Sequence, residues 1–202
     1  MKIVALGDTH GRSIWKEITA KEIDADKIIF IGDYFDSHSN GYSGNRQIEN
    51  FKDIIAFKRA NMDKVVLLIG NHDFHYMNAA QESYSGYQHG YAIDINALLE
   101  EALKDGLLQM CYKHDDFFFS HAGLTKTWVD NAFVGATFDD VKPTIETIEQ
   151  DVNDLFKYKP TRFRFTMGDR FSNTGDDITQ PPIWVRPVSL VSDMFEGKDK
   201  TK

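Results

Sequence analysis

The stretch KIVALGDTHG, residues 2–11, decides how the rest of the chain is interpreted. Its first half is mostly apolar and contains β-branched side chains, which is typical of a strand buried in a parallel sheet. The strand pattern stops at Gly7, and a carboxylate and an imidazole follow at Asp8 and His10. Both side chains are ligands that suit divalent metals such as Mn, Fe and Zn. The stretch therefore predicts a strand that ends in two metal ligands.

Two further segments repeat this arrangement. KIIFI, residues 27–31, is followed by GDYFD, and KVVLLI, residues 64–69, is followed by GNHD. Each apolar run thus ends in a glycine, which permits a tight turn and close backbone approach. The carboxyl ends of parallel strands lie at one edge of a sheet, where ligands bind in open α/β folds. We therefore expect the polar side chains of all three segments to converge.

Helical patterns separate these strands. Ser13 can cap a helix that continues through Ile14, Trp15 and Ile18. Apolar residues recur at helical spacing between Ile48 and Lys58. The alternation predicts an α/β fold with a parallel sheet and right-handed crossovers.

The second half of the chain has a looser pattern. After Pro160 it reads as an irregular functional or capping loop. The elements expected before that point are a helix over 93–104, adjacent strands LLQMCY (107–112) and FFFSH (117–121) around the turn-forming KHDD, and a helix over 139–157.

Composition places the chain among ordinary folded proteins. Its 202 residues are 42% hydrophobic and 27% charged, and they predict one domain over 1–195 with a frayed polar tail over 196–202. The formal charge of −8 argues against long nucleic acid as a partner. We expect no leader and no membrane span, and a buried single Cys111. These features favour a cytoplasmic protein.

A fourth cluster completes a recognisable series. FFFSHAG, residues 117–123, ends an apolar run with His121. GDTHG, GDYFD, GNHD and SHAG, in that order, resemble the calcineurin-like metallophosphoesterases. The second and third motifs are similar to the branch that contains the serine/threonine protein phosphatases and the bacterial diadenosine tetraphosphatases. The resemblance covers residues 1 to about 125 and extends loosely to WVRP near Arg186. It implies a layered β-sheet core with flanking helices, and metals at the carboxyl edge of the strands.

The resemblance also implies a set of ligands for two divalent metal ions, with Mn²⁺ favoured over Fe or Zn. Asp8 and His10 would bind the first metal, Asp33 would bridge both, and Asn71 and His121 would bind the second. Such a pair lowers the pKa of a shared water and holds the phosphoryl oxygens for in-line attack. A metal-bound hydroxide would be the nucleophile, with no covalent intermediate.

His72 and Asp36 are the expected proton-transfer pair. By resemblance, His72 is the general acid that protonates the leaving oxygen, and Asp36 holds its imidazole in the working tautomer. The sequence leaves open whether His75 lies at the rim of the active site or in solvent. It also leaves open whether the tyrosines of the following loop form a wall over the site or pack as in any loop: Tyr76, Tyr84, Tyr87 and Tyr91.

Two departures from the family pattern bear on function. Ser37 stands where the branch usually has an arginine that grips phosphate. We expect Arg186 to take that role, with Arg46 and Arg12 as weaker candidates. His121 is the last histidine of the sequence, whereas the family supplies one more to the second metal. Either the chain is shortened relative to its relatives, or a water or another residue fills that position, or the second metal is weakly held. We hypothesise a second site of reduced affinity.

These observations predict a dinuclear metal-dependent phosphoesterase that hydrolyses a phosphomonoester or a phosphoanhydride. Its substrate would be a phosphoprotein, a nucleotide or a smaller phosphorylated metabolite. The alternative is a catalytically weakened domain of the same fold that acts by binding a phosphorylated ligand. Nuclease activity on phosphodiesters is a third possibility. The sequence does not specify the oligomeric state.

Overall fold

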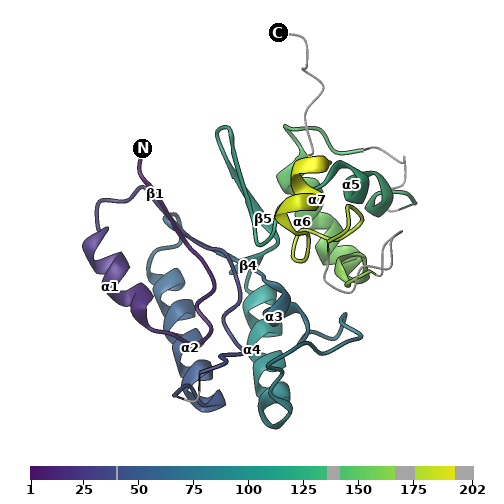
Figure 1. Ribbon diagram of the computed structural model, residues 1–202. Coiled ribbons are helices and arrows are strands. Elements are labelled where there is room, and N and C mark those ends of the chain that lie inside the picture. The colour runs from purple at the N-terminus through teal and green to yellow at the C-terminus, as the bar shows by residue number, and fades with distance from the viewer. Residues whose placement is uncertain (40, 136–141, 167–175, 194–202) are drawn as a thin grey trace. The chain divides into compact units, whose positions relative to one another are not determined.

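The computed structural model describes residues 1–39, 41–135, 142–166 and 176–193. Contacts divide the chain into two compact units, Met1–Gln109 and Met110–Lys202. Among the described residues, the first unit contains a parallel sheet with its connecting helices, and the second contains a two-stranded hairpin and further helices (Figure 1).

Four strands form the parallel sheet of the first unit, in the order β1-β2-β3-β4. Leu6 pairs with Phe30, and Phe30 pairs with Leu67, so the first three strands end in register. The expected convergence of their carboxyl ends is therefore confirmed, as is the α/β class. The strands are β1 (Ile3–Leu6), β2 (Lys27–Phe30), β3 (Val65–Leu68) and β4 (Leu108–Gln109).

Helices connect the strands and pack beside them. Trp15 joins two of these helices to the sheet, because its ring centroid lies 5.7 Å from that of Phe30 and 5.5 Å from that of Phe57. The Trp15 indole also donates to Asn50 at 3.1 Å. The elements are α1 (Ile14–Lys21), α2 (Gly44–Ala60), α3 (Asn71–Phe74), the 3₁₀ turn η1 (His89–Tyr91) and α4 (Ala92–Lys104).

The two inner strands β2 and β3 contain the most buried part of the sheet. Ile29, Phe30, Leu67 and Leu68 are fully buried, and each such side chain stabilises the fold by roughly 1.5–3 kcal/mol relative to exposure. The outer strand β1 differs, because Ala5 is exposed. The prediction of strands apolar and buried on both faces therefore holds for β2 and β3 and is wrong for β1, which lies at an edge of the sheet.

The second unit has its own apolar contacts. Phe163 packs against Trp128 and Phe156, with ring centroids 5.2 Å away in both cases. Asn153 accepts from the Met110 N–H at 2.8 Å and donates to the Cys111 carbonyl at 3.0 Å. The elements are β5 (Cys111–His114), β6 (Phe117–Ser120), α5 (Lys126–Ala132), α6 (Ile148–Tyr158), the 3₁₀ turn η2 (Pro160–Phe163) and α7 (Pro187–Ser192).

The LLQMCY segment is two strands rather than the predicted one. Its first part is β4, parallel to β3, and its second part is β5, antiparallel to β6, with Met110 between them. An apolar run cannot show where a chain changes its strand partner, because both strands need the same residue types. The expected turn at KHDD is confirmed, because β5 and β6 on either side of it pair as an antiparallel hairpin.

Other boundaries also differ from the sequence pattern. The helix expected over 139–157 begins only at Ile148, after Pro143 and a turn; residues 139–141 lie outside the described residues. Ser13 does precede α1, but its side chain makes no capping hydrogen bond. The pattern did not indicate α5 or α7. The single domain over 1–195 stays a prediction, and the tail over 196–202 lies outside the described residues.

Two glycines allow the ends of β2 and β3 to approach each other. Gly32 has φ +104°, and a Cβ there would lie 2.4 Å from the Gly70 nitrogen. A Cβ on Gly70 would lie 2.1 Å from Oδ1 of Asp33. Close approach therefore requires a glycine at both positions, and the left-handed backbone is a second reason at Gly32.

We expect Gly32→Ala to destabilise the fold by roughly 2 kcal/mol or more, because the new methyl group meets backbone in a left-handed conformation. The midpoint of urea unfolding measures this loss. Gly90→Ala is the matched control, since no atom lies within 4 Å of the position of its Cβ. Equal midpoints for the two variants would contradict the close approach.

Candidate functional site

Three polar residues that follow β1 and β2 have left-handed backbone. His10 has φ 43°, Asp33 has φ 55° and Asp36 has φ 65°. Non-glycine residues adopt this region rarely, and such strain persists where the surroundings enforce it, often at functional sites. Here the His10 N–H donates to the Asp33 carbonyl at 2.8 Å, and the Gly11 N–H donates to the Tyr34 carbonyl at 2.8 Å. The two strand-end loops thus hold each other in these conformations.

Asp8, His10 and Asp33 form the first candidate metal cluster. One ligand atom from each lies within 4.8 Å of the others. Nε2 of His10 is 4.0 Å from Oδ2 of Asp8 and 3.8 Å from Oδ2 of Asp33. These distances exceed a hydrogen bond, as expected of atoms that could share a cation. The side chain of Asp8 is 53% exposed and that of Asp33 is 4% exposed, so an ion could reach the cluster from the Asp8 side.

The tautomer of His10 suits a metal ligand. Its Nδ1 lies 2.5 Å from the Phe35 carbonyl. A carbonyl can only accept, so Nδ1 carries the proton and the Nε2 lone pair faces the carboxylates. Metal-binding histidines commonly donate their other ring N–H to a carbonyl or carboxylate in this way. The residues present therefore fit a divalent cation.

Asp33 is held from two directions. Its Oδ1 accepts from the His72 N–H at 2.9 Å, which leaves Oδ2 as the oxygen nearest to His10. Its own N–H donates to Asp73 at 2.8 Å. The carboxylate of Asp33 is thus oriented by the first turn of α3.

Asp73 was assigned no role from the sequence, yet it joins these loops. It is fully buried. Its Oδ2 accepts from the N–H groups of Asp33 at 2.8 Å and Gly70 at 2.9 Å, and its Oδ1 accepts from Tyr34 at 2.8 Å. Burial and the neighbouring Asp33 raise the pKa of Asp73, whereas these backbone donors oppose the rise. The position of Asp73 in GNHD, three residues after the glycine that follows β3, was the available signal for this role.

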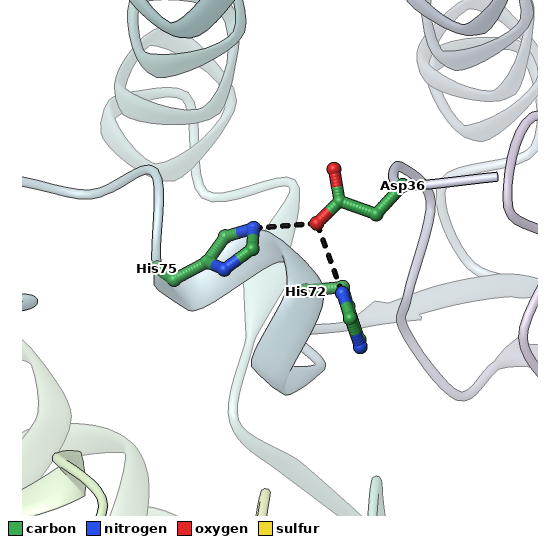
Figure 2. A group of neighbouring side chains, drawn as sticks. All are labelled: Asp36, His72 and His75. Carbon is green, nitrogen blue, oxygen red and sulfur yellow. Dashed lines mark hydrogen bonds and ion pairs between the residues drawn. The ribbon is translucent and has the colours of Figure 1, made fainter. Parts of the chain in front are cut away.

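A second cluster consists of Asp36, His72 and His75 (Figure 2). Oδ2 of Asp36 lies 2.9 Å from Nδ1 of His72 and 2.6 Å from Nε2 of His75. The Tyr76 hydroxyl donates to the other oxygen of Asp36. The expected pairing of Asp36 with His72 is therefore present in the structure, with two further residues added to it.

Electrostatics within this cluster favour an ionised Asp36. Burial alone would raise its pKa, but hydrogen bonds from His72, His75 and Tyr76 outweigh burial and hold the pKa well below its usual range. For His72, burial opposes the charged form. The hydrogen bond to Asp36 and the nearby Asp33 outweigh this effect and raise the pKa of His72.

The structure shows where His75 lies and what three of the four tyrosines contact. His75 is buried rather than at the rim or in solvent, with 4% of its surface exposed. The spacing of His72 and His75 was a usable signal, because residues three apart share a face of a helix. Of the four tyrosines, Tyr76, Tyr84 and Tyr87 pack around the His75 ring.

The two clusters are adjacent. The rings of His10 and His72 are 5.4 Å apart in an edge arrangement, and the exposed His38 lies 6.4 Å from each. Asn71 is the first residue of α3 and is buried. In the position of the family arginine, the backbone N–H of Ser37 donates to the side chain of Gln47 at 3.1 Å.

The remaining predicted residues lie farther along the chain or on its surface. His121 directly follows β6, and Arg186 precedes α7 with its guanidinium 5.8 Å from the Trp184 ring centre. Both belong to the second unit. Arg12 donates to the Asp8 carbonyl at 2.6 Å, and Arg46 donates to the Gly41 carbonyl at 2.9 Å.

Comparison with known proteins gives one match. A family model described as calcineurin-like phosphoesterase matches residues 1–184. No curated protein and no solved structure matched the chain. Across the described residues, the helices are too short or too polar to cross a membrane.

We expect Asp73→Asn to lower the free energy of unfolding by about 1–3 kcal/mol, because an amide group turned toward backbone N–H donors leaves at least one of them unsatisfied. Urea unfolding measures the change. Asp53→Asn is the control, because Asp53 is exposed and pairs only with the exposed Lys16 among the contacts described. A loss no larger than that of the control would show that the Asp73 contacts contribute little.

Proposed function

We propose, from the premise that the chain belongs to the calcineurin-like phosphoesterase family, that it hydrolyses a phosphomonoester or a phosphoanhydride with the help of two divalent metal ions. The observation that supports this best is the Asp8, His10 and Asp33 cluster. Its imidazole has its tautomer set by a backbone carbonyl, and the Asp36 and His72 pair lies beside it.

The resemblance to the family supplies the metal ligands of this proposal. Asp8 and His10 would hold one ion, Asp33 would contact both, and Asn71 with His121 would hold the second. Divalent cations in such a site polarise the phosphoryl oxygens and lower the pKa of a bound water toward neutrality. Mn²⁺ is the ion we favour, because carboxylate, imidazole and amide ligands suit it.

His72 has the position of a proton donor in this proposal. Its Nδ1 is bonded to Asp36 at 2.9 Å, so the proton available for transfer is on Nε2. The side chain is 15% exposed, which leaves room for contact with a substrate. The hydrogen bond to the Asp36 carboxylate favours the protonated ring that a leaving alkoxide needs.

The substrate is a small phosphorylated molecule, a nucleotide or a phosphoprotein. The charge of −8 disfavours long nucleic acid, whereas bound cations would supply local positive charge for a small anion. Ser37 replaces a bidentate phosphate donor, so Arg186 is proposed to contact the phosphate. Assays with para-nitrophenyl phosphate, a dinucleoside polyphosphate and a phosphopeptide would separate these substrate classes, and a bis-ester would test for nuclease activity.

We expect metal-stripped protein to hydrolyse para-nitrophenyl phosphate only after Mn²⁺ is added, and Asp33→Asn to reduce kcat to background, because Asp33 is the ligand proposed to contact both ions. Chelation by EDTA should reverse the activation. The exposed Asp94→Asn is a matched control that should keep full activity.

Two outcomes would decide between the proposed enzyme and the binding alternative. Metal-dependent turnover that Asp33→Asn abolishes supports the enzyme. If no substrate class turns over and the protein still binds Mn²⁺ and a phosphorylated ligand by calorimetry, the weakened binding domain becomes the better account.

We expect His72→Asn to keep its metal content and to lose kcat by about 10²–10⁴-fold on phenyl phosphate, a poor leaving group that needs a proton. The loss on para-nitrophenyl phosphate should be much smaller, because its leaving group departs unprotonated. Metal analysis and steady-state kinetics measure both effects. Equal losses on the two substrates would count against His72 as the acid.

A further inference from the structure

We infer that His75, assisted by Tyr76, is a positioning residue of the proposed reaction: it holds the Asp36 carboxylate that in turn orients His72. The inference rests on the proposed function and deepens it by extending the proton-transfer pair to four residues. His75 does not touch the substrate in this account. It acts through Asp36 (Figure 2).

The protons on His75 are assigned by its neighbours. The Tyr84 backbone N–H donates to Nδ1 of His75 at 3.1 Å, so Nδ1 carries a lone pair and Nε2 carries the proton in the neutral ring. That Nε2 lies 2.6 Å from Oδ2 of Asp36, in a close polar contact that is off the axis of a straight hydrogen bond. Among the described residues, Nε2 has no other hydrogen-bond partner. Its N–H therefore depends on this carboxylate.

Asp36 needs such support because of where it lies. It sits in a loop with φ 65°, and a carboxylate attached to one backbone point can rotate about its side-chain bonds. His72 and His75 both approach Oδ2, while the Tyr76 hydroxyl donates to Oδ1. Contacts on both oxygens fix the plane of the carboxylate. The direction of the His72 ring follows from that plane.

The segment 84–88 holds His75 and Tyr76 in turn. Tyr84 stacks on His75 with ring centroids 5.3 Å apart and planes 16° from parallel, and Tyr87 meets it edge-on at 4.9 Å. The Gln88 N–H donates to the Tyr76 hydroxyl at 2.8 Å. A Cβ on Gly86 would lie 3.0 Å from Cβ of Asp36, so the same segment also approaches Asp36 closely.

The geometry favours a hydrogen-bonded network over a metal site at this cluster. Asp36, His72 and His75 could in principle share an ion, but their facing atoms are only 2.6 and 2.9 Å apart, at hydrogen-bond distance. The side chains of Asp36 and His75 are fully buried. By contrast, the atoms of the Asp8, His10 and Asp33 cluster are 3.8–4.0 Å apart.

The kinetic test compares His75→Phe with His75→Gln. Phe removes the donor and keeps an aromatic ring, whereas the Gln amide nitrogen can replace Nε2. With Mn²⁺ present, we expect His75→Phe to lower kcat on phenyl phosphate by about 10–100-fold with little change in KM, and less on para-nitrophenyl phosphate. His75→Gln should recover most of the activity. Equal losses on both substrates, or no recovery by Gln, would overturn the inference.

A double-mutant cycle tests whether His75 acts through Asp36. In an Asp36→Asn background, His75→Phe should cause little further loss of kcat, because the residue through which it acts is already changed. Fully additive losses would overturn the inference. If His75→Phe does not fold, Tyr76→Phe provides the same test, since it removes one donor to Asp36 and deletes only a hydroxyl.

Imidazole ¹⁵N NMR gives a readout that is independent of turnover. We expect an Nδ1–H signal of His72 in the native protein, as its contact with Asp36 requires, and a shift of that signal in His75→Phe. Asp94→Asn is the control, because Asp94 is exposed and outside the network. An unchanged His72 signal in His75→Phe, or a lower Mn²⁺ stoichiometry in His75→Gln, would overturn the inference. If native protein has no activity but His72 shifts as expected, the proposed function fails and the positioning role stands.

Discussion

The structure depends on the buried carboxylate of Asp73, which accepts three backbone N–H groups from the loops after β2 and β3. These donors would otherwise lie unsatisfied inside the protein, at a cost of about 1–3 kcal/mol each. By binding them, Asp73 holds the left-handed Asp33 in place and seats the first turn of α3 against it. The first candidate cluster takes Asp33 from the loop after β2, and the second takes Asp36 from that loop and both histidines from the segment after β3. The geometry of both clusters therefore depends on this one side chain.

Backbone groups also decide which nitrogen of each key imidazole carries a proton. The Phe35 carbonyl requires a proton on Nδ1 of His10, which leaves Nε2 as a ligand. The Tyr84 N–H requires a lone pair on Nδ1 of His75, which leaves the proton on Nε2, in close polar contact with Asp36. Two histidines within the same unit thus receive opposite tautomers and, in our proposal, opposite tasks. The assignment follows from main-chain hydrogen bonding rather than from the identity of the side chain.

The strands of the first unit were predictable because each apolar run is short, rich in β-branched residues and ended by a glycine. The boundary between β4 and β5 was not predictable, because an apolar run is compatible with either sheet. Only pairing with a partner strand decides which sheet each part of the run joins. The short helices α5 and α7 have six or seven residues, too few for a clear helical period. The first candidate metal cluster was predicted from motif order, whereas Asp73 and His75 were missed as site residues because their contacts depend on loops brought together by folding.

The sequence by itself determined the parallel sheet, the common edge at which its first three strands end, and the residue types available there. Hydrophobic periodicity and the positions of glycines involve residues that are close together in the sequence, so the sequence alone reveals them. Only the tertiary structure decided that Asp73 joins two loops, that His75 is buried against Asp36, and which proton each imidazole holds. These features depend on contacts between residues that are as many as 40 positions apart in the sequence, and no local pattern specifies which distant donor will meet which acceptor.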